Sequence, residues 1–149
     1  MPQLHRSLAA LALIAAANVS AQNCATTRNA SQQDIGRGEG VVLLRSMVAA
    51  CKSQSPESFF RLQTSGAQST VAGASDKKSL FANYCEFISE AVKALGGNIE
   101  SGTHSIGTYK GRSACGAPAS YWFIHTKDGN LALRLAVAIE SGQLRIATQ

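Results

Sequence analysis

Hydrophobic residues recur at spacings of three and four along two stretches of the chain, residues 37–53 and 77–95, which is the pattern of an amphipathic helix. The apolar face of the second stretch consists of Phe81, Tyr84, Ile88, Ala91, Val92 and Leu95. Two glycines at 96–97 end this helix. A short helix is expected between the two, in residues 55–62, because a serine that can cap it is followed by a proline, which is favoured at the first helical position.

Beyond the two glycines the spacing of apolar residues changes to two, which indicates extended strands. The predicted strands are residues 98–110, 120–126, 131–139 and 144–146. A hairpin turn at Asp128-Gly129 joins the second strand to the third, and Ser141-Gly142 turns the chain again. Helices followed by strands predict an α+β fold, in which N-terminal helices pack on a C-terminal, curved, four-stranded antiparallel sheet. Residues 37–149 are expected to form one domain of this kind.

Two segments lack any apolar period. Residues 22–36 are rich in Asn, Thr, Ser and Gln and are predicted to be a flexible N-terminal arm. Residues 63–76 are small or polar and contain two glycines, so an exposed loop is predicted. Because fourteen residues is long for a loop in a small domain, it serves binding or is disordered, and disorder is the favoured interpretation.

The N-terminus has the organisation of a secretory signal peptide. His5 and Arg6 precede an apolar stretch from Leu8 to Ala17, and small residues occupy the two positions that a signal peptidase reads before a cleavage site after Ala21. An apolar stretch of this length is too short to span a membrane, which takes roughly 20 residues. We therefore predict that residues 1–21 are removed and that the protein is exported, with no membrane insertion.

Four cysteines, Cys24, Cys51, Cys85 and Cys115, follow the predicted signal peptide. An even number at wide spacing in an exported protein predicts two disulfides, whereas zinc binding would need closer pairs. Three pairings are open. Because Cys51 ends one predicted helix and Cys85 lies within another, we favour Cys51 with Cys85, which leaves Cys24 to fasten the N-terminal arm to Cys115.

The net charge of the chain excludes few classes of partner. The chain has 14 Lys and Arg against 9 Asp and Glu, and loss of the signal peptide removes only Arg6, so the net charge falls from +5 to +4. The basic residues are scattered between Arg28 and Arg145 without interleaved aromatics. A solvated basic surface is the favoured interpretation, attraction to an acidic partner or an anionic envelope polymer is the alternative, and nucleic acid is not expected as a partner.

Three stretches carry a resemblance to a known superfold. They are Ala94-Leu95-Gly96-Gly97 before the first predicted strand, Ser120-Tyr121-Trp122-Phe123 in the second, and Gly142-Gln143-Leu144-Arg145-Ile146 at the end. With the order of elements, they make residues 37–149 similar to small bacterial envelope proteins of the nuclear-transport-factor-like, cystatin-like superfold. The resemblance implies a cone-like shape whose concave sheet can hold a pocket, a scaffold that serves enzymes, binding proteins and partner docking alike.

Few residues suggest chemistry. In the catalytic hypothesis His125 faces the inside of the cone and transfers a proton, while Tyr121 or Tyr109 binds an oxyanion. The favoured interpretation is that His125 is a partly buried strand residue and His104 a surface residue. Glu86 and Glu90, one helical turn apart, are taken as a solvated helix face and not as a metal site.

No phosphate, metal or cofactor site is predicted. The glycines of residues 36–40 precede a helix but follow no strand and lack the lysine of a phosphate loop, so a flexible hinge is favoured there. The aromatic cluster Tyr121-Trp122-Phe123 is expected to give two side chains to the core and one to a partner. Tyr121, Trp122 and His125 are the candidate partner-binding residues.

By elimination, the sequence favours a periplasmic, non-enzymatic protein-binding module, in its specific form an immunity or inhibitor protein that neutralises an antibacterial toxin in the envelope. The alternative is a carrier of small molecules, or an isomerase-type enzyme, that uses the cavity of the cone.

Overall fold

A helical N-terminal part and a C-terminal sheet make up the computed structural model, which describes residues 24–147. The helices are α1 (Gln32–Asp34), α2 (Gly40–Lys52), α3 (Pro56–Phe60), α4 (Ser65–Ala72) and α5 (Lys77–Ala94), with a π-helical turn η1 (Ile35–Glu39) and a 3-10 turn η2 (Ala114–Gly116). The strands are β1 (Thr27–Asn29), β2 (Thr103–Thr108), β3 (Ser120–His125), β4 (Leu131–Glu140) and β5 (Gln143–Ile146). The predicted signal peptide, residues 1–21, lies outside the described residues.

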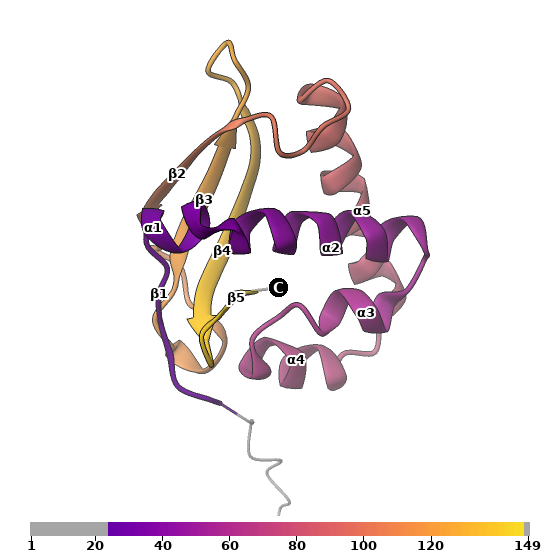
Figure 1. Cartoon of the computed structure of the whole chain (residues 1–149). Coiled ribbons are helices and arrows are strands. Elements are labelled where there is room, and N and C mark those ends of the chain that lie inside the picture. The colour runs from indigo at the N-terminus through magenta and orange to yellow at the C-terminus, as the bar shows by residue number, and fades with distance from the viewer. Residues whose placement is uncertain (1–23, 148–149) are drawn as a thin grey trace, which may run out of the picture.

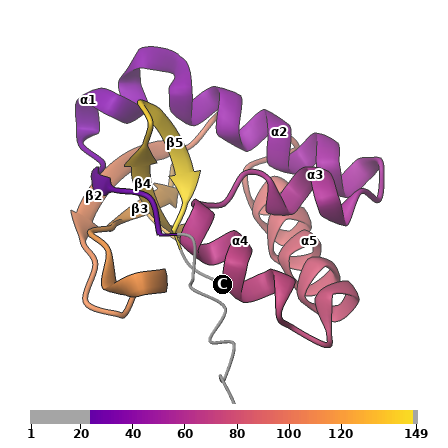
Figure 2. The ribbon, with the colours of Figure 1, turned by 90° about the horizontal axis from the view of Figure 1, so that it is seen from below.

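The predicted α+β fold, with helices before an antiparallel sheet, is confirmed. The three predicted helices correspond to α2, α3 and α5, and the four predicted strands to β2 through β5. In Figure 1, α2 crosses in front of the sheet and α5 lies beside β4. Seen from below in Figure 2, α3, α4 and α5 lie to one side of the sheet, and α2 extends over both parts.

β4 is the strand on which the sheet assembles. The strand order is β1-β4-β3-β2, and β5 also pairs with β4. Val137 is opposite both Ser120 of β3 and Ile146 of β5, so these two strands lie on opposite edges of β4. β1 pairs with residues 138–140, along the same edge of β4 that pairs with β3 at residues 131–137. The sheet therefore has five strands, one more than predicted, and it is not closed.

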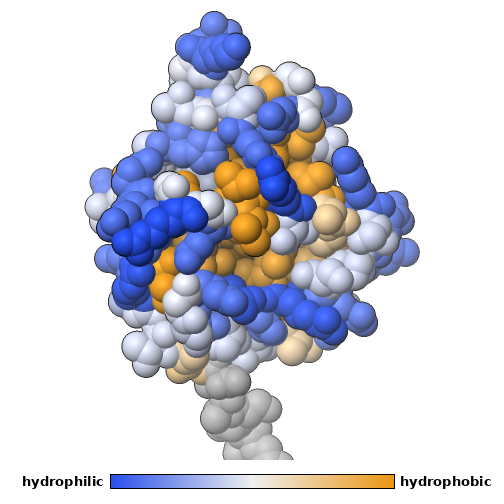
Figure 3. All heavy atoms as spheres, viewed as in Figure 1, coloured by the Kyte–Doolittle hydropathy of each residue, from blue (hydrophilic) through white to orange (hydrophobic). Residues whose placement is uncertain are grey.

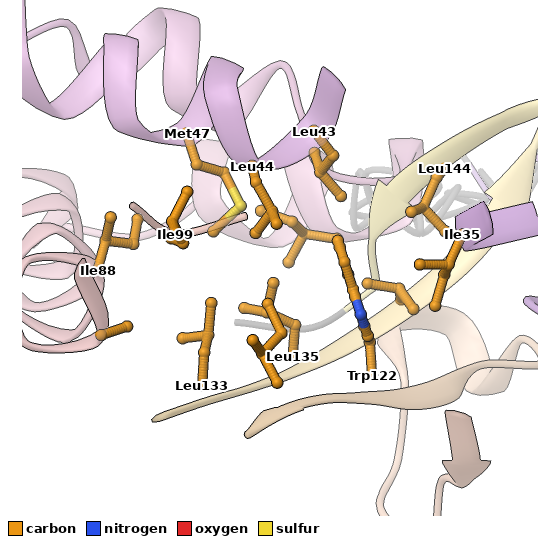
Figure 4. Close-up of a cluster of buried hydrophobic side chains, with 14 of the residues drawn as sticks. Ile35, Leu43, Leu44, Met47, Ile88, Ile99, Trp122, Leu133, Leu135 and Leu144 are labelled. Atoms are coloured by element: carbon orange, nitrogen blue, oxygen red, sulfur yellow. The ribbon is translucent and has the colours of Figure 1, made fainter. Parts of the chain in front are cut away.

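The core lies between the inner face of the sheet and α2 and α5. Figure 4 shows Leu133, Leu135 and Trp122 pointing from the sheet toward α2, with Ile99 between Met47 of α2 and Ile88 of α5. Trp122, Met47 and Leu44 are fully buried. Apolar residues at alternate strand positions meet the apolar helix faces, and this burial is the main stabilising contribution in a domain of this size.

The described part of the predicted arm, residues 24–36, contains regular secondary structure. It includes β1 and α1, and Arg28 forms a bidentate ion pair with the buried carboxylate of Asp34, with both distances 2.8 Å. Ser31 accepts a hydrogen bond from the Asp34 amide while its own amide donates to the Asp34 carboxylate, a capping box. Hydrogen bonding to Arg28 holds the pKa of Asp34 well below its usual range. The polar residues of this arm thus take part in strand pairing and in capping of α1.

The prediction of an exposed loop at residues 63–76 is wrong. It contains α4, which Thr64 caps by accepting a hydrogen bond from the Ala67 amide, and Ala67 and Val71 are buried. Before it, the Thr64 amide donates to the Ile146 carbonyl at 2.8 Å, which extends the sheet past β5. The helix was missed because its buried face consists of small residues, which give a weak hydrophobic period.

The glycine-rich segment of residues 36–40 forms the kink between α1 and α2. Gly38 has a φ of 89°, a conformation that favours glycine. A Cβ on Gly40 would lie 3.1 Å from the Trp122 ring, so a side chain there would crowd the core. These two glycines are therefore explained by backbone conformation and packing.

Both disulfides that the sequence favoured are present. Cys51–Cys85 joins α2 to α5, and Cys24–Cys115 joins the arm to η2. The described cysteines therefore include no free thiol. Among residues 24–147, no helix combines the length and the apolar character needed to cross a bilayer.

Candidate functional site

The N-terminal half of β4 has one unpaired edge. The Ala136 carbonyl accepts a hydrogen bond from the Ala147 amide, beyond which the described chain ends. Backbone groups alternate along an antiparallel strand, so the N–H and C=O of Arg134 point to this same edge, away from β3. Within residues 24–147, no strand pairs with this edge of residues 131–135. As far as residues 24–147 extend, this stretch of β4 therefore has backbone donors and acceptors without a strand partner.

A groove runs along this edge. Its walls are residues 131–136 of β4 and Tyr84, Phe87, Ile88 and Glu90 of α5, and it encloses about 600 Å³. We call it the edge groove. Phe87 and Leu131 are 68% and 52% exposed, although both are large apolar side chains. The groove thus combines an open strand edge with exposed apolar surface, a combination found where extended peptides bind.

The inner end of the edge groove is neutral. Tyr84 and Met47 line it together with Ile146. Burial raises the pKa of Tyr84 to about 12, and a hydrogen bond with the side chain of the fully buried Gln63 lowers it by less. The Tyr84 hydroxyl therefore stays protonated near neutral pH and can donate or accept a hydrogen bond.

The outer rim of the groove carries a fixed positive charge. The Arg134 guanidinium lies over the Tyr121 ring, 5.2 Å from its centroid, and the Tyr109 ring packs edge-on against Tyr121 at 4.8 Å. A cation–π contact of this kind restrains the guanidinium and uses none of its N–H donors, so they can still bind a carboxylate. Among the described residues, Arg134 forms no ion pair.

The aromatic residues of β3 divide between the two faces of the sheet in a way that corrects the predicted partner-binding set. Trp122 is fully buried and faces the helices, so it is a core residue and cannot anchor a partner in this structure. Tyr121, Phe123 and His125 lie on the opposite face and are half-buried. Two members of the Tyr121-Trp122-Phe123 cluster, and not one, therefore point away from the core. Strand alternation decides this, but the sequence could not tell which face the helices cover.

The expected position of His125 inside the fold is wrong on the same ground. His125 follows Ile124, which is fully buried against the helices, so the imidazole lies on the outer face and not inside the fold. Tyr109 and Tyr121 contact each other on that outer face, and the rings of Phe123 and His125 continue the row at 6.3 Å. These residues do not converge on an interior cavity.

His104, which was taken for a surface residue, contacts the core. Its Nδ1 accepts a hydrogen bond from Trp122 Nε1 at 3.2 Å. Desolvation lowers the pKa of His104, and a hydrogen bond to the Glu100 backbone raises it by less. The neutral imidazole thereby satisfies the indole N–H of a fully buried tryptophan. No local sequence signal shows this, because β2 register alone brings residue 104 next to residue 122.

Glu86 and Glu90 are exposed on α5, as predicted for a solvated helix face. Glu90 Oε1 forms an ion pair with Lys93 Nζ at 2.8 Å. Among the described residues, no cluster of three or more His, Cys, Asp or Glu side chains is arranged to hold a metal ion.

A second cleft separates α2 from α5. It encloses about 620 Å³, its floor includes Val48, Val92, Ile99 and the Cys51–Cys85 disulfide, and Arg45 and Glu100 pair across its rim. Figure 3 shows hydrophobic side chains gathered along α2 between hydrophilic ones on this face of the molecule. This cleft could admit a small apolar molecule.

Comparison with protein-family models, with curated proteins and with solved structures finds no match to this chain.

Proposed function

We propose that the chain is an exported protein-binding module of the bacterial periplasm, which holds an extended segment of a partner protein in the edge groove. The observation that carries the proposal is the unpaired edge of residues 131–135 next to the exposed side chains of Leu131 and Phe87. An added strand would satisfy the free Arg134 backbone groups and cover both apolar side chains. Strand addition draws affinity from main-chain hydrogen bonds and specificity from alternate side-chain pockets.

The edge has features that restrain pairing between two copies of the chain. A register shift in the β3–β4 pairing lies between Ile124 and His125, next to the hairpin, and Arg134 places a charge at the middle of the edge. Bulges and charged residues at sheet edges are known protection against aggregation. Because identical edges would bring two Arg134 side chains together, the groove favours a different polypeptide.

Export is supported by the two disulfides, since such bonds persist in oxidising compartments. In the more specific form of the proposal, the partner is an antibacterial toxin that reaches the envelope, and binding of one of its segments neutralises it. We also propose that the chain is related to the envelope proteins of the nuclear-transport-factor-like, cystatin-like superfold.

Site-specific photo-crosslinking in cells that export the protein tests this proposal. A photoreactive phenylalanine analogue is placed at Phe87 or Leu131 in the edge groove, or at Val42 on α2, which is 64% exposed and serves as a matched control. We expect one protein adduct from both groove positions and none from Val42. Equal labelling from all three positions, or labelling from Val42 alone, would contradict the proposal. If the adduct partner is a toxin, the wild-type chain should protect cells from it.

The α2–α5 cleft supports the alternative function, a carrier of small apolar molecules. Its volume of about 620 Å³ and its apolar floor are the supporting observation. Titration with the fluorescent apolar probe anilinonaphthalene sulfonate tests this function. The comparison variant is Val92→Lys, which places a charged side chain in the cleft. Equal probe binding by both proteins would count against the carrier.

A further inference from the structure

We infer that the partner segment held in the edge groove alternates apolar and acidic residues, with one carboxylate placed opposite Arg134. This inference rests on the proposed strand addition and specifies the chemistry of the partner. It follows from the two faces that β4 presents at its open edge, which differ in polarity.

The outer face of the added strand would meet a cation. In an antiparallel pair, directly opposite residues project to the same face with their Cβ atoms about 4.5–5.5 Å apart. Arg134 lies on the outer face, where the Tyr121 ring holds its guanidinium at 5.2 Å from the ring centroid. A residue opposite Arg134 therefore places its side chain beside an oriented guanidinium, which binds a carboxylate best.

The inner face of the added strand would meet apolar walls. The neighbours of that carboxylate residue point the other way, since side chains alternate along a strand. There the groove is lined by Met47, Ile88 and Leu133. Apolar side chains at these two positions would be removed from water, whereas charged ones would be buried without a partner.

The other charges at the groove leave this preference intact. Glu90 faces the groove from α5, but its carboxylate is paired with Lys93 at 2.8 Å. Tyr84 is neutral at pH 7, as a tyrosine ordinarily is, and burial raises its pKa further, to about 12. Among the described groove residues, Arg134 is thus the charge without an opposite partner.

Binding of matched peptides to the oxidised protein tests the inference. In nine-residue fluorescent peptides, Val alternates with Thr, and the central Thr is replaced by Glu or by Lys. We expect the Glu peptide to bind the wild-type chain roughly 5- to 10-fold more tightly, and Arg134→Glu to reverse the order. Lys78→Glu, an exposed site at the start of α5, changes the net charge by the same amount and should keep the wild-type order.

Hydrogen exchange and a modified peptide distinguish the inference from the proposed function. The Glu peptide should slow exchange of the Arg134 amide, and N-methylation of its central residue should abolish binding, whereas N-methylation of the adjacent residue should not. If Glu and Lys peptides bind equally and both slow this exchange, strand addition stands and the charge inference is overturned. If no peptide slows it, the proposed function is overturned as well.

Discussion

The two halves of β4 differ in how their edges are used. Residues 137–140 pair with β5 on one edge, and with β3 or β1 on the other, whereas among the described strands residues 131–135 pair with β3 alone. Val137 and Ala138 are fully buried, while Leu131 and Arg134 are exposed. One strand therefore contains both the most enclosed backbone of the sheet and its open edge.

This difference shows how a small domain combines stability with an open strand edge. Ends of the chain that are distant in sequence, β1 and β5, enclose the C-terminal half of β4. The N-terminal half is supported from its faces, by β3 beside it and by α5 across the groove. An open edge can persist in a stable protein because the opposite half carries the stabilising contacts.

The largest expected effect comes from replacing both Cys24 and Cys115 by serine. The change frees β1 from the edge of residues 138–140 and makes that half of β4 resemble the open one. This bridge joins residues 91 apart in sequence, and a loop of that size gives up to about 4.5 kcal/mol of chain-entropy stabilisation. Urea unfolding measures the loss. The matched control replaces Cys51 and Cys85 by serine. The disulfide between these two closes a shorter loop, so this variant should lose less stability; the reverse order would contradict the comparison.

Amide hydrogen exchange should separate the two halves of β4 directly. The Arg134 amide points to the open edge, while that of Ala138 points to β5, where the residue is opposite Arg145. We expect at least about 1000-fold faster exchange at Arg134, since local opening of an unpaired amide costs little and core amides open with nearly the global free energy. Leu135, whose amide points to β3, is the control and should exchange slowly. Similar rates at Arg134 and Ala138 would mean that the edge is paired.

Truncation to alanine compares the side chains of the two halves. Ile139→Ala removes a buried side chain and should lower the free energy of unfolding by about 2–5 kcal/mol. Leu131→Ala acts on a side chain that is 52% exposed and should change it by about 0.5 kcal/mol or less. Equilibrium urea unfolding at pH 7 measures both. A loss at Leu131 as large as that at Ile139 would show that the groove is packed in solution.

Asp34→Asn weakens the attachment of the arm that carries β1. We expect a loss of about 1–3 kcal/mol at neutral pH, since the Arg28 guanidinium loses its carboxylate partner. The folded-state pKa of Asp34 is lowered, so its contribution is full above the ordinary carboxyl pKa and is lost as the pH falls through the folded value. In unfolding measured from pH 7 to pH 2, the difference between the two proteins should therefore narrow once the pH falls below the ordinary carboxyl value of 3.8. A constant difference would contradict the assignment to this ion pair.

The smallest effect is expected at His104, which supports the open half through Trp122, the neighbour of Leu135 on β3. Desolvation lowers the pKa of His104, so the folded protein should lose stability as the pH falls below the ordinary histidine value of 6.5. The loss should stay below about 1 kcal/mol because the imidazole is partly solvated. Unfolding followed by Trp122 fluorescence at pH 7.5 and pH 5 measures it. His104→Gln should show a smaller difference between the two pH values.

Much of the fold could be predicted from local patterns, because α2, α3, α5 and the strands β2 to β5 each follow a period that their own residues define. Even the disulfide pairing followed from the helices that hold Cys51 and Cys85. The candidate site could not be predicted in this way. Phe87 and Leu131 are ordinary apolar residues of a helix and a strand, and nothing in their neighbours marks them as exposed.

The sequence by itself determined the helices α2, α3 and α5, the strands β2 to β5 and the two disulfides, and export stays a prediction. Tertiary structure alone decided that the polar residues of β1 pair with β4, that the small residues of α4 form a packed helix, and that Trp122 faces inward. It also decided where β5 ends along β4, so that within residues 24–147 no strand covers this edge of residues 131–135. The reason is that pairing and facing depend on segments distant in the chain, whereas periodicity records only each residue's near neighbours.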